Sequence, residues 1–106
     1  SLERQVQRAV ANVLSEGVPT LSLIASDLGI GARTLQRRLS EQGMSFQNVV
    51  DKARRELAER LLRETNYSLA EIAFLTGLSE QSGYTRAFNR WAGQTPRSYR
   101  LQSGIE

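Results

Sequence analysis

The sequence predicts an all-α protein in which two helix-turn-helix subdomains are joined by a long linker helix, about seven helices in all. Three observations support this fold class. Residues 45–64 carry apolar side chains every three or four positions, which is the spacing of one helix face. A short motif occurs once before this segment and once after it. Glycines stand where the predicted helices must end. The predicted division is therefore 1–44 for the first subdomain, 45–64 for the linker helix and 65–106 for the second subdomain.

The first helix is predicted over residues 2–16. Val6, Val10 and Leu14 recur every four residues, and Gly17 follows as a stop. The abrupt beginning of the sequence suggests that it is a fragment of a longer protein.

A motif of the form [S/T]-L-x-x-I-A-x-x-x-G-[I/L] occupies residues 20–30 and recurs 48 positions later at residues 68–78. In each copy the hydroxyl residue, Thr20 or Ser68, is expected to cap a short helix. In the second copy Glu71 completes a capping box. The glycine of each copy supplies the left-handed residue that ends the helix and turns the chain. Each copy therefore predicts a helix-turn-helix.

The second helix of the first copy is predicted over residues 32–42, with Gly43 as its stop and with Leu35 and Leu39 on its buried face. The opposite stripe consists of Arg33, Gln36 and Arg37.

The corresponding helix of the second copy is predicted over residues 80–91, with Ser79 as its cap. Its apolar face is expected to consist of Tyr84, Ala87, Phe88 and Trp91, and its outer face of Gln81, Ser82, Thr85, Arg86 and Asn89. Arginine pairs with guanine, glutamine pairs with adenine, and threonine contacts the thymine methyl group. The stripes on both helices are therefore suited to reading the base edges of DNA.

The linker helix over residues 45–64 is expected to begin with Ser45 and Asn48 capping each other. Its length of about 30 Å is close to one turn of B-DNA, roughly 34 Å, so we interpret it as a spacer between two DNA-reading units. Its apolar face is expected to comprise Phe46, Val49, Val50, Ala53, Leu57 and Leu61, and its arginines Arg54, Arg55, Arg60 and Arg63 to form a solvated face. A short last helix is predicted over residues 97–100 after Thr95-Pro96, with Tyr99 packed inward.

The composition argues against catalysis and metal binding. The chain has no Cys and no His, which removes the commonest general base and the commonest metal ligands, so we expect no catalytic residue, no metal and no cofactor. No apolar run approaches the ~18 residues of a membrane span. The net charge is only +3, but all of the 14 basic residues except Lys52 are arginines, which suit bidentate contacts with phosphate and guanine.

Several residues also fall at the spacings of a known family. They are Gly29-Ile30, Arg33-Thr34-Leu35-Gln36-Arg37, Ile72-Ala73, Gly77-Leu78, Tyr84, Arg86, Phe88, Arg90, Gly93, Thr95-Pro96 and Tyr99-Arg100. On these residues the sequence resembles the DNA-binding domain of the AraC/XylS family of bacterial transcription regulators, from about Leu2 to Arg100. It departs from that pattern at Leu78 and Tyr84, where Phe is usual, at Gly31, where a Ser cap is frequent, and at Gly83 inside the second reading helix.

The resemblance implies sequence-specific binding of double-stranded DNA in two successive major grooves, and regulation of bacterial transcription in the cytoplasm. The base contacts that it implies are Arg33, Gln36, Arg37, Gln81, Ser82, Thr85 and Arg86. The expected phosphate contacts are Thr20, Thr34, Arg38, Ser68, Asn89 and Arg90. It also implies contact with RNA polymerase, through which the chain would act as an activator or as a repressor, and an effector or dimerisation domain elsewhere in the full-length protein.

Two other functions remain open from the residues themselves. The polar stripes also suit a helical protein-interaction module that binds an acidic partner, and the same DNA contacts would serve a recombinase-type accessory domain. Binding of labelled duplex in excess random competitor DNA would separate DNA reading from protein interaction.

Overall fold

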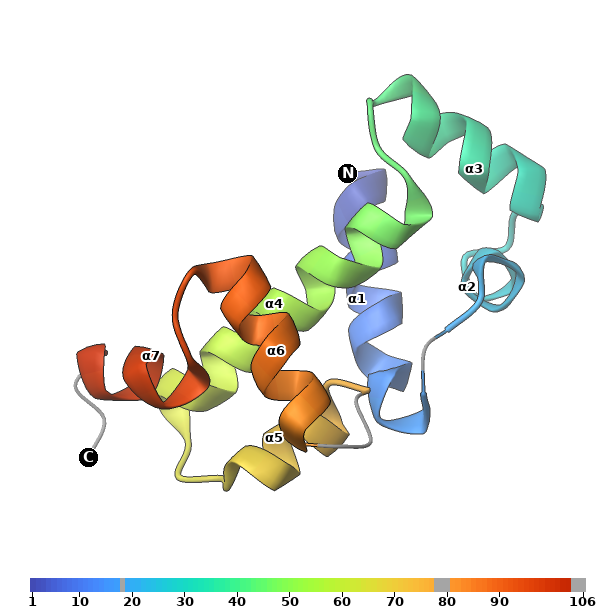
Figure 1. The fold of residues 1–106 in the computed structure, drawn as a ribbon. Helices are drawn as coiled ribbons and strands as arrows, with labels where there is room; N and C mark the ends of the chain where they lie inside the picture. Colours follow the sequence, from blue (N-terminus) through green and yellow to red (C-terminus); the bar gives the residue numbers. More distant parts are fainter. Residues whose placement is uncertain (18, 78–80, 104–106) are drawn as a thin grey trace. The chain divides into compact units, whose positions relative to one another are not determined.

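The computed structural model describes residues 1–17, 19–77 and 81–103, with the side chains of residues 81–84 outside the description. Within this part every regular element is a helix, which confirms the predicted all-α class (Figure 1). The elements in chain order are α1 (Leu2–Val13), the 3-10 helix η1 (Leu14–Glu16), α2 (Leu21–Asp27), α3 (Ala32–Glu41), α4 (Phe46–Glu64), α5 (Leu69–Leu75), α6 (Gln81–Ala92) and α7 (Pro96–Gln102).

None of the helices in this part of the chain combines the length and the apolar character that crossing a membrane requires.

The chain divides into two compact units, Ser1–Ala53 and Arg54–Glu106. The division falls inside α4, so each unit contains one helix-turn-helix and one part of this helix. The finer predicted division into two subdomains and a linker stays a prediction.

In the first unit, α1 buries Val6 and Val10 completely, as the four-residue spacing predicts. The α-helix ends at Val13, earlier than predicted, and η1 continues it so that Leu14 is also buried. Gly17 then adopts a positive φ of 115°, a conformation that favours glycine.

Helices α2 and α3 form the first helix-turn-helix. The Thr20 hydroxyl accepts a hydrogen bond of 3.1 Å from the Leu23 N–H and so caps α2. The chain turns at Gly29, whose φ is +73°, and the Ile30 N–H closes the turn on the Ala25 carbonyl at 3.0 Å. The first copy therefore forms the helix-turn-helix that the repeat predicts.

Helix α4 begins with the reciprocal cap that the sequence predicts. The Asn48 N–H donates to the Ser45 hydroxyl at 3.1 Å, and the Ser45 N–H donates to the Asn48 side chain at 3.2 Å. In the first unit Val49, Val50 and Ala53 are buried, and Lys52 forms a 2.9 Å ion pair with Glu3 of α1.

The second part of α4 differs from the prediction. Its buried residues are Ala58 and Leu62, whereas Leu57 and Leu61 are only half-buried. The expected solvation of Arg54 is wrong, because this residue is 8% exposed. Residues four apart lie along nearly one line of a helix, so Arg54 occupies the line of Ala58 and Leu62 and is buried with it.

The core of the second unit consists of Ala58, Leu62, Ile72, Ala73 and Phe88, which are buried residues of α4, α5 and α6. Leu61, Leu69, Trp91, Ala92 and Tyr99 pack against it and are partly buried. Inward packing of Tyr99 is thus confirmed, and its ring meets Phe88 edge-on with a centroid distance of 5.5 Å.

Helix α7 is held against the end of α4 by two arginines. Arg100 of α7 donates hydrogen bonds to the carbonyls of Leu62 and Thr65, both at 3.2 Å. Arg63 of α4 donates to the Tyr99 hydroxyl at 2.9 Å. The two Arg100 bonds satisfy carbonyls at a helix end, and all three bonds fix α7, which carries the aromatic partner of Phe88.

Candidate nucleic-acid interface

Helix α3 presents the stripe that the sequence predicts. Leu35 and Leu39 are fully buried and fix the rotation of the helix about its axis. Arg33, Gln36 and Arg37 are consequently exposed. The solvent-facing side chains of α3 thus include those whose donors and acceptors suit base edges.

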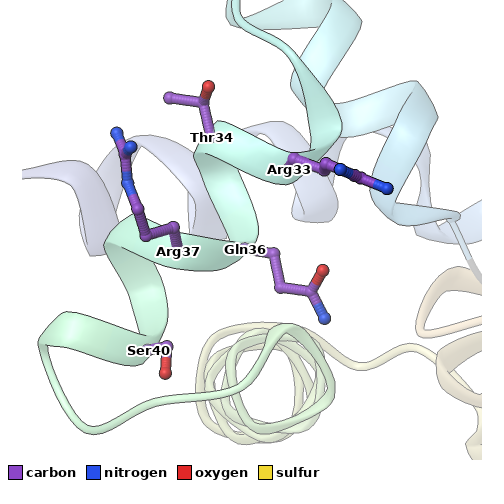
Figure 2. A pocket seen from close by; sticks show the side chains of 5 residues that line it. All are labelled: Arg33, Thr34, Gln36, Arg37 and Ser40. Carbon is purple, nitrogen blue, oxygen red and sulfur yellow. The ribbon is translucent and has the colours of Figure 1, made fainter.

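These residues line one open hollow in the surface of the first unit. Its lining consists of Arg33, Thr34, Gln36, Arg37 and Ser40, and Figure 2 shows how the five side chains leave α3. None of them is acidic, and within the described residues neither Arg33 nor Arg37 forms an ion pair with the protein. The hollow therefore offers two cations and several hydrogen-bonding groups to an anionic, hydrogen-bonding ligand.

The beginning of α3 differs from that of the other short helices. Its N-cap is Gly31, which makes no side-chain hydrogen bond, and a Cβ at this position would meet only the Thr34 hydroxyl at 3.9 Å. The first turn of α3 thus lacks the side-chain cap that Thr20 gives to α2.

Helix α6 carries the second predicted stripe. Ala87 and Phe88 are buried, Thr85 is half-buried, and Arg86, Asn89 and Arg90 are exposed. Gly83 lies within this helix. The predictions that Gln81 and Ser82 read bases, that Tyr84 belongs to the apolar face and that Ser79 caps the helix concern side chains outside the described part.

The remaining predicted contacts lie at helix starts and beside the α3 stripe. The Ser68 hydroxyl accepts the Glu71 N–H at 3.1 Å while the Glu71 carboxylate accepts the Ser68 N–H at 3.0 Å, which is the predicted capping box. Thr20 and Ser68 are exposed, and capping uses the Thr20 oxygen as an acceptor, which leaves its O–H able to donate to a phosphate. Thr34 is half-buried and Arg38 is exposed.

Two features of the surface escape the sequence reasoning. Ser40 lines the hollow with the predicted residues, and its spacing of three from Arg37 and four from Gln36 is the signal that would have found it. A second, more apolar hollow on the second unit is lined by Tyr67, Ala70, Glu71, Phe74 and Leu75, and Phe74 is 61% exposed there. The repeat does not predict it, because Ser26 stands at the position of Phe74 in the first copy.

The chain is similar to known helix-turn-helix proteins. The profile of the helix-turn-helix domain family matches residues 24–102. The transcriptional regulator VirS of Mycobacterium tuberculosis is 37% identical over 105 residues, which are 99% of this chain and 31% of VirS. The chain thus spans about a third of the length of this relative.

Solved structures show the same fold. A DNA-binding transcriptional dual regulator from Escherichia coli K-12 superposes with a TM-score of 0.88 at 24% identity, covering 100% of this chain and 95% of that one. The DNA-binding domain of the global transcriptional factor AdpA, solved in complex with a target DNA, gives a TM-score of 0.68 at 27% identity and covers 92% of this chain and 90% of that one. With its paired helix-turn-helix units and a family profile that matches most of its length, the chain belongs to the AraC/XylS family of helix-turn-helix transcriptional regulators.

Proposed function

We propose that this chain binds a specific, asymmetric site on double-stranded DNA, with α3 and α6 each entering a major groove, and that it regulates bacterial transcription as the DNA-binding part of a longer regulator. The observation that carries the proposal is the acid-free hollow on α3, where Gln36 and two arginines that form no ion pair with the described residues lie on one exposed face. The DNA complex of AdpA supports the same use of the fold.

The proposed contacts fall into two classes. Base contacts come from Arg33, Gln36 and Arg37 of α3 and from Gln81, Ser82, Thr85 and Arg86 of α6. Phosphate contacts come from Thr20, Thr34, Arg38, Ser68, Asn89 and Arg90. Phosphate contacts fix the register of the protein on the duplex, and base contacts select the sequence. Because the two stripes differ in sequence, the preferred site is not a palindrome.

Membership of the family supports a wider role. Transcription is activated through contact with RNA polymerase, in the cytoplasm, and an effector or dimerisation domain completes the regulator. The length of VirS, of which this chain matches 31%, supports the further domain. The chain itself is a binding module with no catalytic function, which agrees with the absence of Cys and His from its sequence.

Selection of bound duplexes from a random pool tests this function directly. The selected duplex should stay bound in excess random competitor DNA, and binding should weaken steeply as salt rises because several phosphates are neutralised. Arg37→Ala should cost about 1–3 kcal/mol of specific binding and relax the preference at one base pair.

Two further arginine variants provide comparisons for Arg37→Ala. Arg55→Ala removes the same charge from an exposed arginine of α4 that pairs with Glu59 at 3.0 Å, and it should leave the selected sequence unchanged. Arg38→Ala should weaken all sequences about equally and lower the salt slope by about 1, as for a phosphate contact. If random competitor displaces the selected duplex from the unchanged chain, sequence-specific DNA binding is refuted.

A further inference from the structure

We propose that Ser40 is an additional base-contacting residue of α3, so that the reading stripe of the first unit extends from Arg33 to Ser40. This inference rests on the proposed function and adds a specificity-determining residue to it. Ser40 is exposed and lines the same hollow as Arg33, Gln36 and Arg37.

The position of Ser40 around the helix axis favours a base contact over a phosphate contact. At about 100° per residue, Gln36 and Arg37 lie about 60° to one side and 40° to the other side of Arg33. Ser40 falls about 20° from Arg33, between those two directions. Thr34 and Arg38 lie about 100° and 140° away, at the edge of the stripe, where side chains reach the backbone of a duplex.

Figure 2 agrees with these directions. Thr34 and Arg37 point upward in this view, whereas Gln36 and Ser40 point downward, so Ser40 lies on the side of the helix that carries Gln36 and away from Thr34. Ser40 therefore shares a side with Gln36, which is proposed to read a base, whereas Arg37 leaves the helix on the side of Thr34.

The hydroxyl of Ser40 is also available to a ligand. Serine and threonine inside a helix often donate to the carbonyl four residues earlier. Thr65, Thr76 and Ser103, each directly after the last residue of a helix, make this bond here, with donor–acceptor distances of 2.6, 2.8 and 3.0 Å to Leu61, Ile72 and Tyr99. Within the described residues, the Ser40 hydroxyl makes no hydrogen bond to the protein.

The chemistry of the contact follows from the size of serine. A hydroxyl can donate to or accept from a base edge, so it discriminates less strongly than a bidentate arginine. Ser40 is seven residues beyond Arg33, which is about 10 Å along the helix axis and so spans at most about three base pairs at 3.4 Å each, the limit for a helix parallel to the DNA axis. Its base pair should therefore lie at the opposite end of the α3 subsite from that of Arg33.

Duplex selection with the unchanged chain, Ser40→Ala and Arg33→Ala tests this inference. Ser40→Ala should relax one base pair within about three positions of the one that Arg33→Ala relaxes, and should lower affinity for the best duplex about three- to tenfold. Ser15→Ala, at an exposed serine in η1, is the matched control and should change neither quantity. Circular dichroism should show an unchanged helix content, since Ser40 is exposed.

The outcomes separate this inference from the proposed function. An unchanged site and affinity for Ser40→Ala, together with a relaxed site for Arg37→Ala, would overturn the role of Ser40 and leave DNA reading by α3 intact. Equal weakening of all duplexes by Ser40→Ala would also overturn it, because that is the behaviour of a phosphate contact. If the unchanged chain itself selected no sequence, both the role of Ser40 and the proposed function would be refuted.

Discussion

Phe88 and Phe74 have the same side chain but opposite environments within the second unit. Phe88 is completely buried in the core, whereas Phe74 is 61% exposed beside Tyr67. Phe88→Ala should therefore lower the free energy of unfolding by about 3–5 kcal/mol. Phe74→Ala should change it by no more than about 0.5 kcal/mol, as for other exposed substitutions. Urea unfolding followed by circular dichroism measures both, and equal costs would contradict the assigned core.

Gly31 and Gly29 give a second matched pair, in the turn of the first helix-turn-helix. Gly31 has an ordinary extended conformation, with φ −75°, and has open space around its Cβ position, so Gly31→Ser should cap α3. We expect it to raise the free energy of unfolding by about 0.5–1 kcal/mol, partly by restricting the unfolded chain. Gly29 has φ +73°, so Gly29→Ala should be destabilising instead. The midpoint temperature of thermal unfolding should rise for Gly31→Ser and fall for Gly29→Ala. A stabilising Gly29→Ala would contradict the turn geometry.

At the scale of the helices, the ends were easier to predict than the buried faces. The caps at Thr20, Ser45 and Ser68 depend on side chains adjacent in sequence, and all three are present. The early end of α1 and the 3-10 turn after it were not predictable, because Leu14 is buried equally well by either kind of helix.

The buried face of α4 shows why packing is harder to predict. The pattern of apolar residues favours Leu57 and Leu61, yet Ala58 and Leu62 are the ones fully buried. Both pairs have the same spacing of four, so periodicity alone cannot choose between adjacent lines on a helix. The choice depends on the residues of α5 and α6 that pack against α4, and it also places Arg54 inside.

The capping box of α5 makes the stability of this helix depend on pH. Hydrogen bonds from the Ser68 backbone N–H and then from its hydroxyl lower the pKa of Glu71 below its ordinary value of 4.5. The folded state therefore binds fewer protons at this site than the unfolded state. The resulting stabilisation is present above pH 4.5 and is lost as the pH falls through the lower, folded pKa.

Glu71→Gln should consequently destabilise the protein more at pH 7 than at pH 3, in denaturant titrations at each pH. Thr20 provides the control, because its helix has Leu23 in the place of Glu71 and so lacks the carboxylate. Thr20→Ala should lower stability by the same amount at both values of pH. A Glu71→Gln effect that does not change with pH would show that the carboxylate contributes nothing through its charge.

At the scale of the whole molecule, the internal repeat predicted the two helix-turn-helix units and the stripe on α3. The described residues support Arg33, Gln36 and Arg37 as one exposed surface. Ser40 was missed because the carried-over family positions ended at Arg37, although the helix and its exposed face continue for another turn. The assignment of individual residues to bases or phosphates stays a prediction, because it depends on the depth at which α3 enters the groove.

The continuity of α4 across the two units leads to a test of whether both act on one duplex. Helix α4 runs without interruption from Phe46 to Glu64, through the division between Ala53 and Arg54. One alanine inserted after the exposed Glu56 would rotate the following residues about 100° and shift them about 1.5 Å relative to those before it.

If both units must meet the same duplex in a fixed register, specific affinity should fall by about 10³-fold or more, toward the non-specific level. Glu56→Ala should leave it unchanged, and helix content should be the same in both variants. Undiminished affinity after the insertion would show that the two units bind DNA independently, since no fixed register could survive that rotation.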